Sequence, residues 1–426
     1  MSKKNSNVLA IAIMFFLFAM ISFVTGLQNP MGVIVKSQFG ATNAMSQLGN
    51  LANFIAYAFM GLPAGFILKK YGYKVTSLAA VAVGFIGVGI SFLSGVAESF
   101  AVYLIGAFVS GFSMCMLNTV VNPMLNTLGG GGNRGNQLIQ FGGSLNSLAA
   151  TICPVLVGYL IGEVTADTAI SDANPALFIA MGVFALAFVI ILFSEIPEPE
   201  LEAANTSSQP QESTMQSVSK ALSHRNLVFG VIAIFLYVGI EVGIPNIANL
   251  YMTSPEVGIP AGVAGTVVGM YWLLMLCGRL LGGVIGGKVS SKVMMTVVSS
   301  LAIIFIIIGM FLPEKTVNFP AFNADLSFSM VEIPLGVVFF VLCGLCTSVM
   351  WGAIFNLAVE GLGKYTSIAS GLFMVMVCGG GVLPVIQGAI ADSVGFVDSY
   401  WVLVAALAYI LIFSLFLSKP KVAKAK

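Results

Sequence analysis

The sequence predicts an all-α membrane protein with twelve transmembrane helices in two halves of six. Apolar residues make up 58% of the 426 positions and charged residues only 8%, and the mean hydropathy is +1.00. Apolar runs long enough to cross a bilayer, about 20 residues each, occur twelve times. A polar segment rich in Glu, Ser, Gln and Pro divides these runs into two sets of six. A chain this apolar cannot keep a water-facing surface, so lipid must surround it.

The expected helices follow one another with short polar connections. In the first set they cover residues 8–35, 43–68, 75–96, 99–128, 134–162 and 174–195. In the second set they cover residues 226–252, 260–287, 292–313, 333–362, 365–391 and 397–418. The predicted organisation is an N-terminal half over residues 1–195, a hydrated cytoplasmic linker over 196–225 and a C-terminal half over 226–426.

Basic residues fall almost entirely on one side of the predicted membrane. All Lys and Arg residues except Lys36, Arg279 and Lys315 lie in the termini, in the linker or in connections on that side. Because Lys and Arg are enriched in cytoplasmic loops, both termini and the linker are expected in the cytoplasm. The formal net charge is +1, so the chain offers no basic surface for nucleic acid.

Two charged residues, Glu241 and Arg279, lie inside apolar segments. A carboxylate in the middle of the membrane costs at least ~2.5 kcal/mol on insertion scales, so Glu241 is expected to face a polar cavity or a partner. Gly243 and Pro245 follow it, and these residues suit a broken helix. Two interpretations are open: a structural ion pair or buried protonated acid, and a substrate or cation-coupling site of a transporter. We favour the second and expect Arg279 to lie at a distance.

Amide side chains recur inside the apolar segments and, with one tryptophan, form the predicted substrate-binding set. They are Gln28 and Asn29 in the first helix, Asn118 and Asn122 in the fourth, Gln140 and Asn146 in the fifth, Asn246 and Asn249 in the seventh, Trp351 and Asn356 in the tenth, and Gln387 in the eleventh. An unpaired amide in hydrocarbon is costly, so each must meet another helix or a wet cavity. Helix contact explains any single residue, but the recurrence favours a shared cavity. Amides beside an indole ring suit a neutral, hydroxyl-rich ligand.

Several motifs that could indicate another class of function have simpler structural explanations. Cys343 and Cys346 form a C-x-x-C, but the single histidine, His224, lies far away, so we expect buried thiols. Residues 129–132 (GGGG) lack a preceding strand and a P-loop lysine, and residues 379–381 (GGG) are expected to allow close helix packing. Without a nucleophile–base set or a metal cluster, we expect no enzyme activity and no cofactor. A sensor is not expected either, since no soluble signalling domain is visible.

Four longer motifs resemble one known family. They are residues 118–129 (NTVVNPMLNTLG), 140–149 (QFGGSLNSLA), 237–242 (YVGIEV) and 350–357 (MWGAIFNL). With twelve helices in two halves, they make the chain similar to the major facilitator superfamily and, within it, to the fucose–proton symporter family, especially its glucose/galactose transporter branch. The similarity covers nearly the whole chain apart from the linker and the termini.

The resemblance implies a secondary active transporter of the major facilitator fold. It would import a hexose-type sugar by alternating access, driven by a proton or sodium gradient, with the sugar bound between the halves at the membrane midplane. We expect a multi-pass protein of a bacterial inner membrane that is a monomer and has sugar and lipid as its partners. The alternatives are a carrier for another small neutral solute, such as an amino sugar or a nucleoside, and an uncoupled facilitator.

The chain departs from the fucose permeases at two positions. Those permeases carry an aspartate and a glutamate in the stretches that match residues 28–30 and 117–119, where this chain has Asn29 and Asn118. An amide does not take up and release a proton near neutral pH. Glu241 is therefore the ion-coupling candidate, and coupling to protons, to sodium or to neither stays open.

Overall fold

A computed structural model describes residues 3–129, 132–161, 168–198, 214–285, 289–313, 315–322, 327–362 and 365–419. Within these ranges, twelve helical segments are long and apolar enough to cross a membrane. The seventh covers residues 225–252, against the range 226–252 expected from the sequence, and most of the others begin and end within a few residues of their expected bounds. The predicted all-α membrane fold is confirmed.

The first six spans, which we call the N-half, consist of helices α1 to α7. Their bounds are α1 Lys3–Gly26, α2 Gln28–Phe39, α3 Asn43–Ser46, α4 Leu48–Val96, α5 Phe100–Leu128, α6 Gly132–Ile161, the 3₁₀ turn η1 Ile170–Ala173 and α7 Asn174–Phe193. The last six spans, the C-half, consist of α10 Arg225–Met252, α11 Ala261–Ile285, α12 Ser291–Met310, α13 Leu335–Thr347, α14 Met350–Val359, α15 Thr366–Met376, α16 Gly379–Val394, η3 Asp398–Tyr400, α17 Trp401–Ile412 and η4 Phe413–Leu417.

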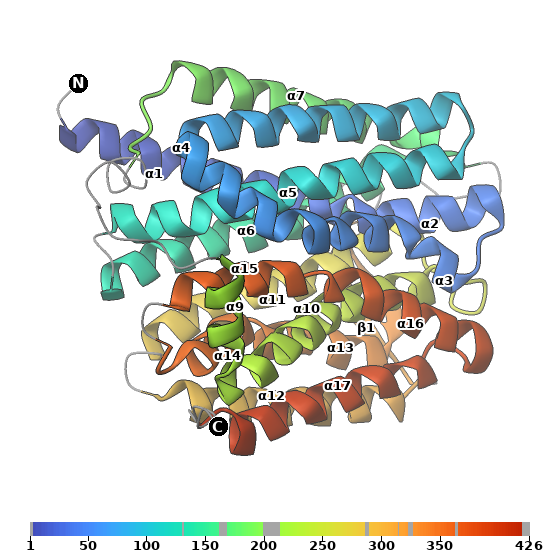
Figure 1. The fold of residues 1–426 in the computed structure, drawn as a ribbon. Coiled ribbons are helices and arrows are strands. Elements are labelled where there is room, and N and C mark those ends of the chain that lie inside the picture. The colour runs from blue at the N-terminus through green and yellow to red at the C-terminus, as the bar shows by residue number, and fades with distance from the viewer. Residues whose placement is uncertain are drawn as a thin grey trace.

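The two halves lie side by side with their helices running in the same general direction (Figure 1). The blue-to-green N-half lies above the yellow-green-to-red C-half in this view. Helix α6 packs against α11, and α4 packs against α15 and α16, so these contacts form the interface between the halves. Helix α1 begins and η4 ends at the left of the view, where helix α9 (Thr214–Leu222) also lies.

Helix α4 contains two spans joined by a tight bend at Gly72. Its φ of 80° and ψ of −179° lie in a region that residues with a Cβ rarely adopt. The carboxylate of Glu198 accepts hydrogen bonds from the backbone N–H groups of Tyr73 at 2.6 Å and Lys74 at 2.9 Å. These donors would otherwise be unsatisfied at the start of the next span. The break expected between residues 68 and 75 is therefore located at Gly72.

A β-hairpin and one short helix were not expected from the sequence. Strands β1 (Thr316–Phe322) and β2 (Phe328–Pro334) form an antiparallel hairpin between the ninth and tenth spans, with Thr316 opposite Pro334. Because β2 continues to Pro334, the tenth span begins at Leu335 rather than at residue 333. Helix α9 lies inside the predicted linker and packs against α15.

Candidate functional site

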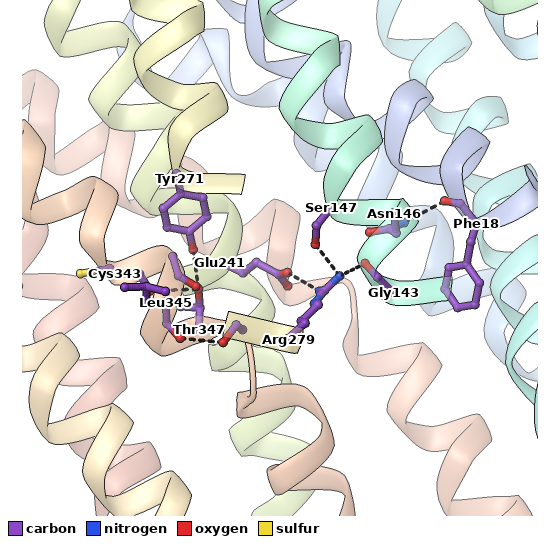
Figure 2. Close-up of polar contacts among 12 residues, drawn as sticks. Phe18, Gly143, Asn146, Ser147, Glu241, Tyr271, Arg279, Cys343, Leu345 and Thr347 are labelled. Carbon is purple, nitrogen blue, oxygen red and sulfur yellow. Dashed lines mark hydrogen bonds and ion pairs between the residues drawn. The ribbon is translucent and has the colours of Figure 1, made fainter. Parts of the chain in front are cut away.

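Glu241 and Arg279 lie close together where the two halves meet. Oε1 of Glu241 is 3.5 Å from Nη2 of Arg279, and each side chain is 14% exposed. Nη1 of the same guanidinium donates to the carbonyl oxygen of Gly143 at 2.6 Å and to Oγ of Ser147 at 2.8 Å (Figure 2). Gly143 and Ser147 belong to α6 of the N-half, whereas Glu241 and Arg279 belong to α10 and α11 of the C-half. The arginine therefore contacts both halves.

This geometry corrects one expectation: Arg279 is not distant from Glu241 but forms an ion pair with it. The two residues are 38 positions apart in the chain, and the packing of α10 against α11 brings them together. A bidentate arginine–carboxylate pair has N···O distances of about 2.7–2.9 Å, so this pair is loose. The arginine makes its shorter contacts with the N-half.

Helix α10 runs without interruption past Glu241. The broken helix expected at Gly243 and Pro245 is wrong, because both residues lie inside the continuous helix Arg225–Met252. Pro245 still has a local effect. It has no N–H group, so the carbonyl of Glu241, one turn earlier, loses its helical donor. The proline changes the hydrogen bonding of the helix without breaking it.

Aromatic side chains lie beside the charged pair. Tyr237 is fully buried one turn before Glu241, and its ring lies edge-to-face with Trp351 at a centroid distance of 6.2 Å. Trp351, near the start of α14, is only partly buried. On α11, the hydroxyl of Tyr271 shares a hydrogen bond of 3.0 Å with Thr347 of α13 (Figure 2). Trp351, the aromatic residue of the predicted set, thus contacts Tyr237, which is one turn from Glu241.

Gln387 on α16 is a predicted site residue with unmet hydrogen-bonding capacity. Its side chain is fully buried and lies against α10 at Gly243. Neither its amide nitrogen nor its oxygen has a hydrogen-bond partner among the residues that the structure describes. An unpaired buried polar group costs about 1–3 kcal/mol, so an amide here calls for a functional explanation. Gln387 is a candidate ligand contact.

Replacing Gln387 by leucine should separate stability from function. Leucine has a similar size and no polar atoms to satisfy, so we expect the thermal unfolding midpoint in detergent to stay the same or rise, and the affinity for the transported solute to fall about tenfold. The control is Gln28→Leu, which removes an amide bonded to Tyr103 and should lower the midpoint. A lower midpoint with unchanged affinity in Gln387→Leu would show that Gln387 is structural.

Two amides predicted in the N-half connect helices. Oε1 of Gln28 accepts a hydrogen bond from the hydroxyl of Tyr103 at 2.7 Å. Nδ2 of Asn146 donates to the carbonyl of Phe18 on α1 at 3.0 Å (Figure 2). In both cases the amide contacts another helix. This is the alternative to a cavity-facing position that the sequence left open.

The asparagines of α5 are half-buried. Nδ2 of Asn118 donates to the hydroxyl of Tyr57 at 3.1 Å, and Nδ2 of Asn122 donates to the backbone carbonyl of Asn118 at 3.0 Å. Their spacing of four places them on one face of the helix, as expected. Each is therefore bonded within the N-half and partly accessible.

The remaining predicted amides are spread over the molecule. Nδ2 of Asn246 donates to Oε1 of Gln47 at 2.9 Å, a buried contact between the halves. Asn249 is also buried on α10. Asn356 is exposed near the end of α14, and its Nδ2 is 3.5 Å from Oγ of Ser291, so it is not among the buried amides. The side chains of Asn29 and Gln140 lie outside the described residues.

The sequence did not identify Arg279 or Ser147 as part of the site. Arg279 could have been found from the sequence, because a charged residue inside an apolar run needs a compensating group nearby. Ser147 gave none, since serine is common where membrane helices pack. In the part of the chain that the structure describes, no group of three or more His, Cys, Asp or Glu side chains is placed to hold a metal ion.

Twelve membrane-spanning helices in two packed halves, with a charged pair and amides between them, define a polytopic membrane transporter. The chain belongs to the Major Facilitator Superfamily, whose family model matches residues 12–383. The predicted fold and family are confirmed, and the protein is a transporter rather than an enzyme.

Similarity to known members extends over almost the whole chain. It is 28% identical over 421 residues to a glucose/galactose transporter of Brucella abortus, covering 98% of this chain and 96% of the relative. It is 22% identical over 431 residues to the L-fucose-proton symporter of Escherichia coli K12, covering 96% and 93%. Among solved structures, the transporter FucP in an outward conformation matches with a TM-score of 0.70 at 19% identity, covering 97% of this chain and all of that one. The structural match shows the fold.

Proposed function

We propose that this protein imports a hexose-type sugar together with protons, by alternating access between the N-half and the C-half. Relatives named as a glucose/galactose transporter and an L-fucose-proton symporter support this substrate class and this coupling ion. The observation that carries the proposal is the Glu241–Arg279 pair, a titratable carboxylate beside a fixed charge at the interface between the halves. A solute bound there contacts both halves, as transport between them requires.

Arg279 favours a proton over sodium as the coupling ion. A sodium ion needs several oxygen ligands around it, whereas a proton needs one carboxylate oxygen. The guanidinium beside Glu241 presents N–H donors and has no acceptor, so it cannot complete a cation site. The neighbouring oxygens of Gly143 and Ser147 are already accepting from Arg279.

Sugar recognition is assigned to the groups around this pair. The unpaired amide of Gln387 matches sugar hydroxyls, and the partly buried ring of Trp351 offers an apolar surface to a sugar ring. Asn118 and Asn122 add half-buried amides from the N-half. A site that hydrogen-bonds hydroxyl groups discriminates strongly against analogues that lack them.

The test is solute uptake by the purified protein in proteoliposomes. We expect one or more of glucose, galactose and fucose to accumulate when an inward proton gradient is imposed, and not with an equal sodium gradient. An amino sugar and a nucleoside serve as competitors. Uptake of the nucleoside without any hexose would overturn the substrate class, and equilibration without accumulation would make the protein a facilitator.

We place the protein in a bacterial inner membrane as a monomer, with both termini cytoplasmic. The distribution of Lys and Arg supports this orientation. It is consistent with the start of α1, helix α9 and the end of η4 lying toward the same end of the molecule (Figure 1). The opposite end, where α3 and the C-terminus of α16 meet, then faces the outside.

The end that contains α3 is closed by contacts between the halves. The Asp392 carboxylate of α16 accepts hydrogen bonds from the backbone N–H groups of Asn43 at 2.8 Å and Ala44 at 3.0 Å. Nζ of Lys36 lies 5.2 Å from the centroid of the Phe396 ring of the C-half, and within the N-half it donates to Oδ1 of Asn43 at 2.5 Å. With the proposed orientation, these contacts close the external end, as alternating access requires of one state.

Asp392→Asn should weaken this closure. An asparagine keeps one acceptor oxygen, but its NH₂ group cannot accept the second backbone N–H. We expect spin labels at Val96 and Phe311, exposed positions on the N-half and the C-half at this end, to show a larger fraction of long distances than in the parent. Asp398→Asn, on η3 at the same end, is the control. An unchanged distance distribution in Asp392→Asn would show that the carboxylate does not hold this end closed.

A further inference from the structure

We infer that Arg279 is a positioning residue that transmits the protonation of Glu241 to the contact between the N-half and the C-half. The inference rests on the proposed function in one respect: Glu241 gains and loses a proton during transport. Three contacts of Arg279 carry the argument: Glu241, which can change its charge near neutral pH, and the carbonyl of Gly143 and the hydroxyl of Ser147, which cannot (Figure 2). The first belongs to its own half and the other two belong to the opposite half.

The distances show which half holds the guanidinium in this state. Its contacts with Gly143 and Ser147 measure 2.6 and 2.8 Å, and its approach to Glu241 measures 3.5 Å. Arginine stays protonated in proteins, so it remains a donor and a positive charge in every step of transport. What changes during transport is the group that compensates this charge.

The compensation differs between the two protonation states of Glu241. With Glu241 charged, the ion pair is neutral as a whole and Arg279 has a counter-charge within its own half. With Glu241 protonated, the guanidinium depends on the oxygens of Gly143 and Ser147, because a buried charge without compensating groups is strongly unfavourable. The protonated state therefore needs α6 and α11 in contact as they are here, whereas the charged state does not.

This difference couples a proton to a conformation. A ligand that binds one conformation better shifts the population toward it, and the effect is reciprocal. Proton uptake by Glu241 then favours the arrangement in which Arg279 reaches α6. Proton release lets Arg279 return to Glu241 and frees the contact with α6. The guanidinium thus links a charge change in one half to the packing between halves.

The other groups around Glu241 do not provide this link. Tyr237 on α10 and Tyr271 on α11 are the further titratable groups that act on Glu241 electrostatically, and Cys343 on α13 lies beyond Tyr271. All belong to the C-half. Helices α14 and α16 contribute Trp351 and Gln387 to this region, and neither titrates near neutral pH. Within the described residues, Arg279 is the charged group that joins Glu241 to α6.

Ser147→Ala tests the inference without changing any titratable group. It removes one of the two N-half acceptors of Arg279, so the protonated state loses stabilisation and more protons are needed to reach it. We expect the pH profile of sugar uptake to move by about one unit to lower pH, equivalent to a tenfold change in proton affinity. The matched control is Thr151→Ala, one turn later on α6, whose hydroxyl donates to the Ser147 backbone carbonyl at 2.9 Å. Its profile should not move.

Arg279→Gln is expected to move the profile in the opposite direction. Removing the guanidinium charge removes the group that competes with the proton for Glu241, so uptake should reach its midpoint at higher pH than in the parent. A packing defect lowers the rate in either variant but does not move the two profiles in opposite directions. Opposite shifts support the inference, and shifts in the same direction overturn it.

A second measurement needs no sugar. Spin labels at Tyr71 and Val293, exposed on the two halves at the end that contains α9, report the separation of the halves as the pH is varied, with the six native cysteines replaced. We expect the distance distribution to titrate in the parent and its midpoint to move to lower pH in Ser147→Ala. If no hexose is transported but this shift occurs, the proposed substrate fails while the inference stands. If sugar is transported and Ser147→Ala moves neither midpoint, the inference is overturned.

Discussion

Glu241→Gln is expected to abolish the accumulation of sugar against a gradient while leaving sugar exchange across the membrane. Glutamine keeps the size and hydrogen-bonding capacity of the side chain but cannot take up and release a proton. Arg279 keeps its contacts with Gly143 and Ser147, so the fold should tolerate the change. The measurements are the accumulation ratio in proteoliposomes under an imposed pH gradient, expected to fall to unity, and counterflow of labelled sugar, expected to persist.

The control is Glu256→Gln, which removes an exposed carboxylate outside the spans and should accumulate sugar as the parent does. Accumulation that survives in Glu241→Gln would show that Glu241 is not the coupling group. Loss of counterflow together with accumulation would instead make Glu241 a direct sugar contact.

Gly379→Ala should prevent normal packing of the C-half. A Cβ at this position would lie 1.9 Å from the carbonyl oxygen and 2.6 Å from the carbonyl carbon of Phe235 on α10. Because both are backbone atoms, the clash is relieved only by moving α16 away from α10. Overpacking in a core costs about 1–3 kcal/mol when side chains can adjust, and a backbone contact offers less adjustment. We expect a markedly lower yield of monodisperse protein and a lower thermal midpoint.

Gly182→Ala is the matched control for this prediction. Gly182 lies inside α7, and a Cβ there meets nothing within 4 Å. Replacing a helical glycine by alanine in open space stabilises a helix by about 0.5–1 kcal/mol, so this variant should be as stable as the parent or more stable. Equal midpoints for the two variants would contradict the close approach of α16 to α10.

The spans were predictable because each depends on a local property of the chain. A run of about 20 apolar residues has no other stable placement, and the bend at Gly72 follows from a residue that tolerates positive φ. Residues 379–381 were expected to allow close packing, which the approach of Gly379 to Phe235 confirms. The hairpin β1–β2 was not predictable, since its strands are short and each contains a proline, Pro320 in β1 and Pro334 in β2, and proline normally marks edge strands or loops.

The site was predictable only where a single residue carries the argument. Glu241 could be identified because a carboxylate inside a span needs compensation. The amides could not be assigned to the site in this way, because the sequence does not show which way a side chain points. Gln28 and Asn146 join helices, whereas Gln387 is buried with unmet capacity. The proximity of Arg279 to Glu241 depends on how the helices pack, which no local pattern reveals.

The most direct test of proton-coupled sugar import is the internal pH of proteoliposomes when sugar is added outside. The vesicles contain a pH-sensitive dye, and no ion gradient is imposed. If Glu241 carries the coupled proton, a transported hexose should acidify the interior with the parent protein and leave it unchanged with Glu241→Gln. Entry of labelled hexose through the parent protein without any acidification would contradict the account.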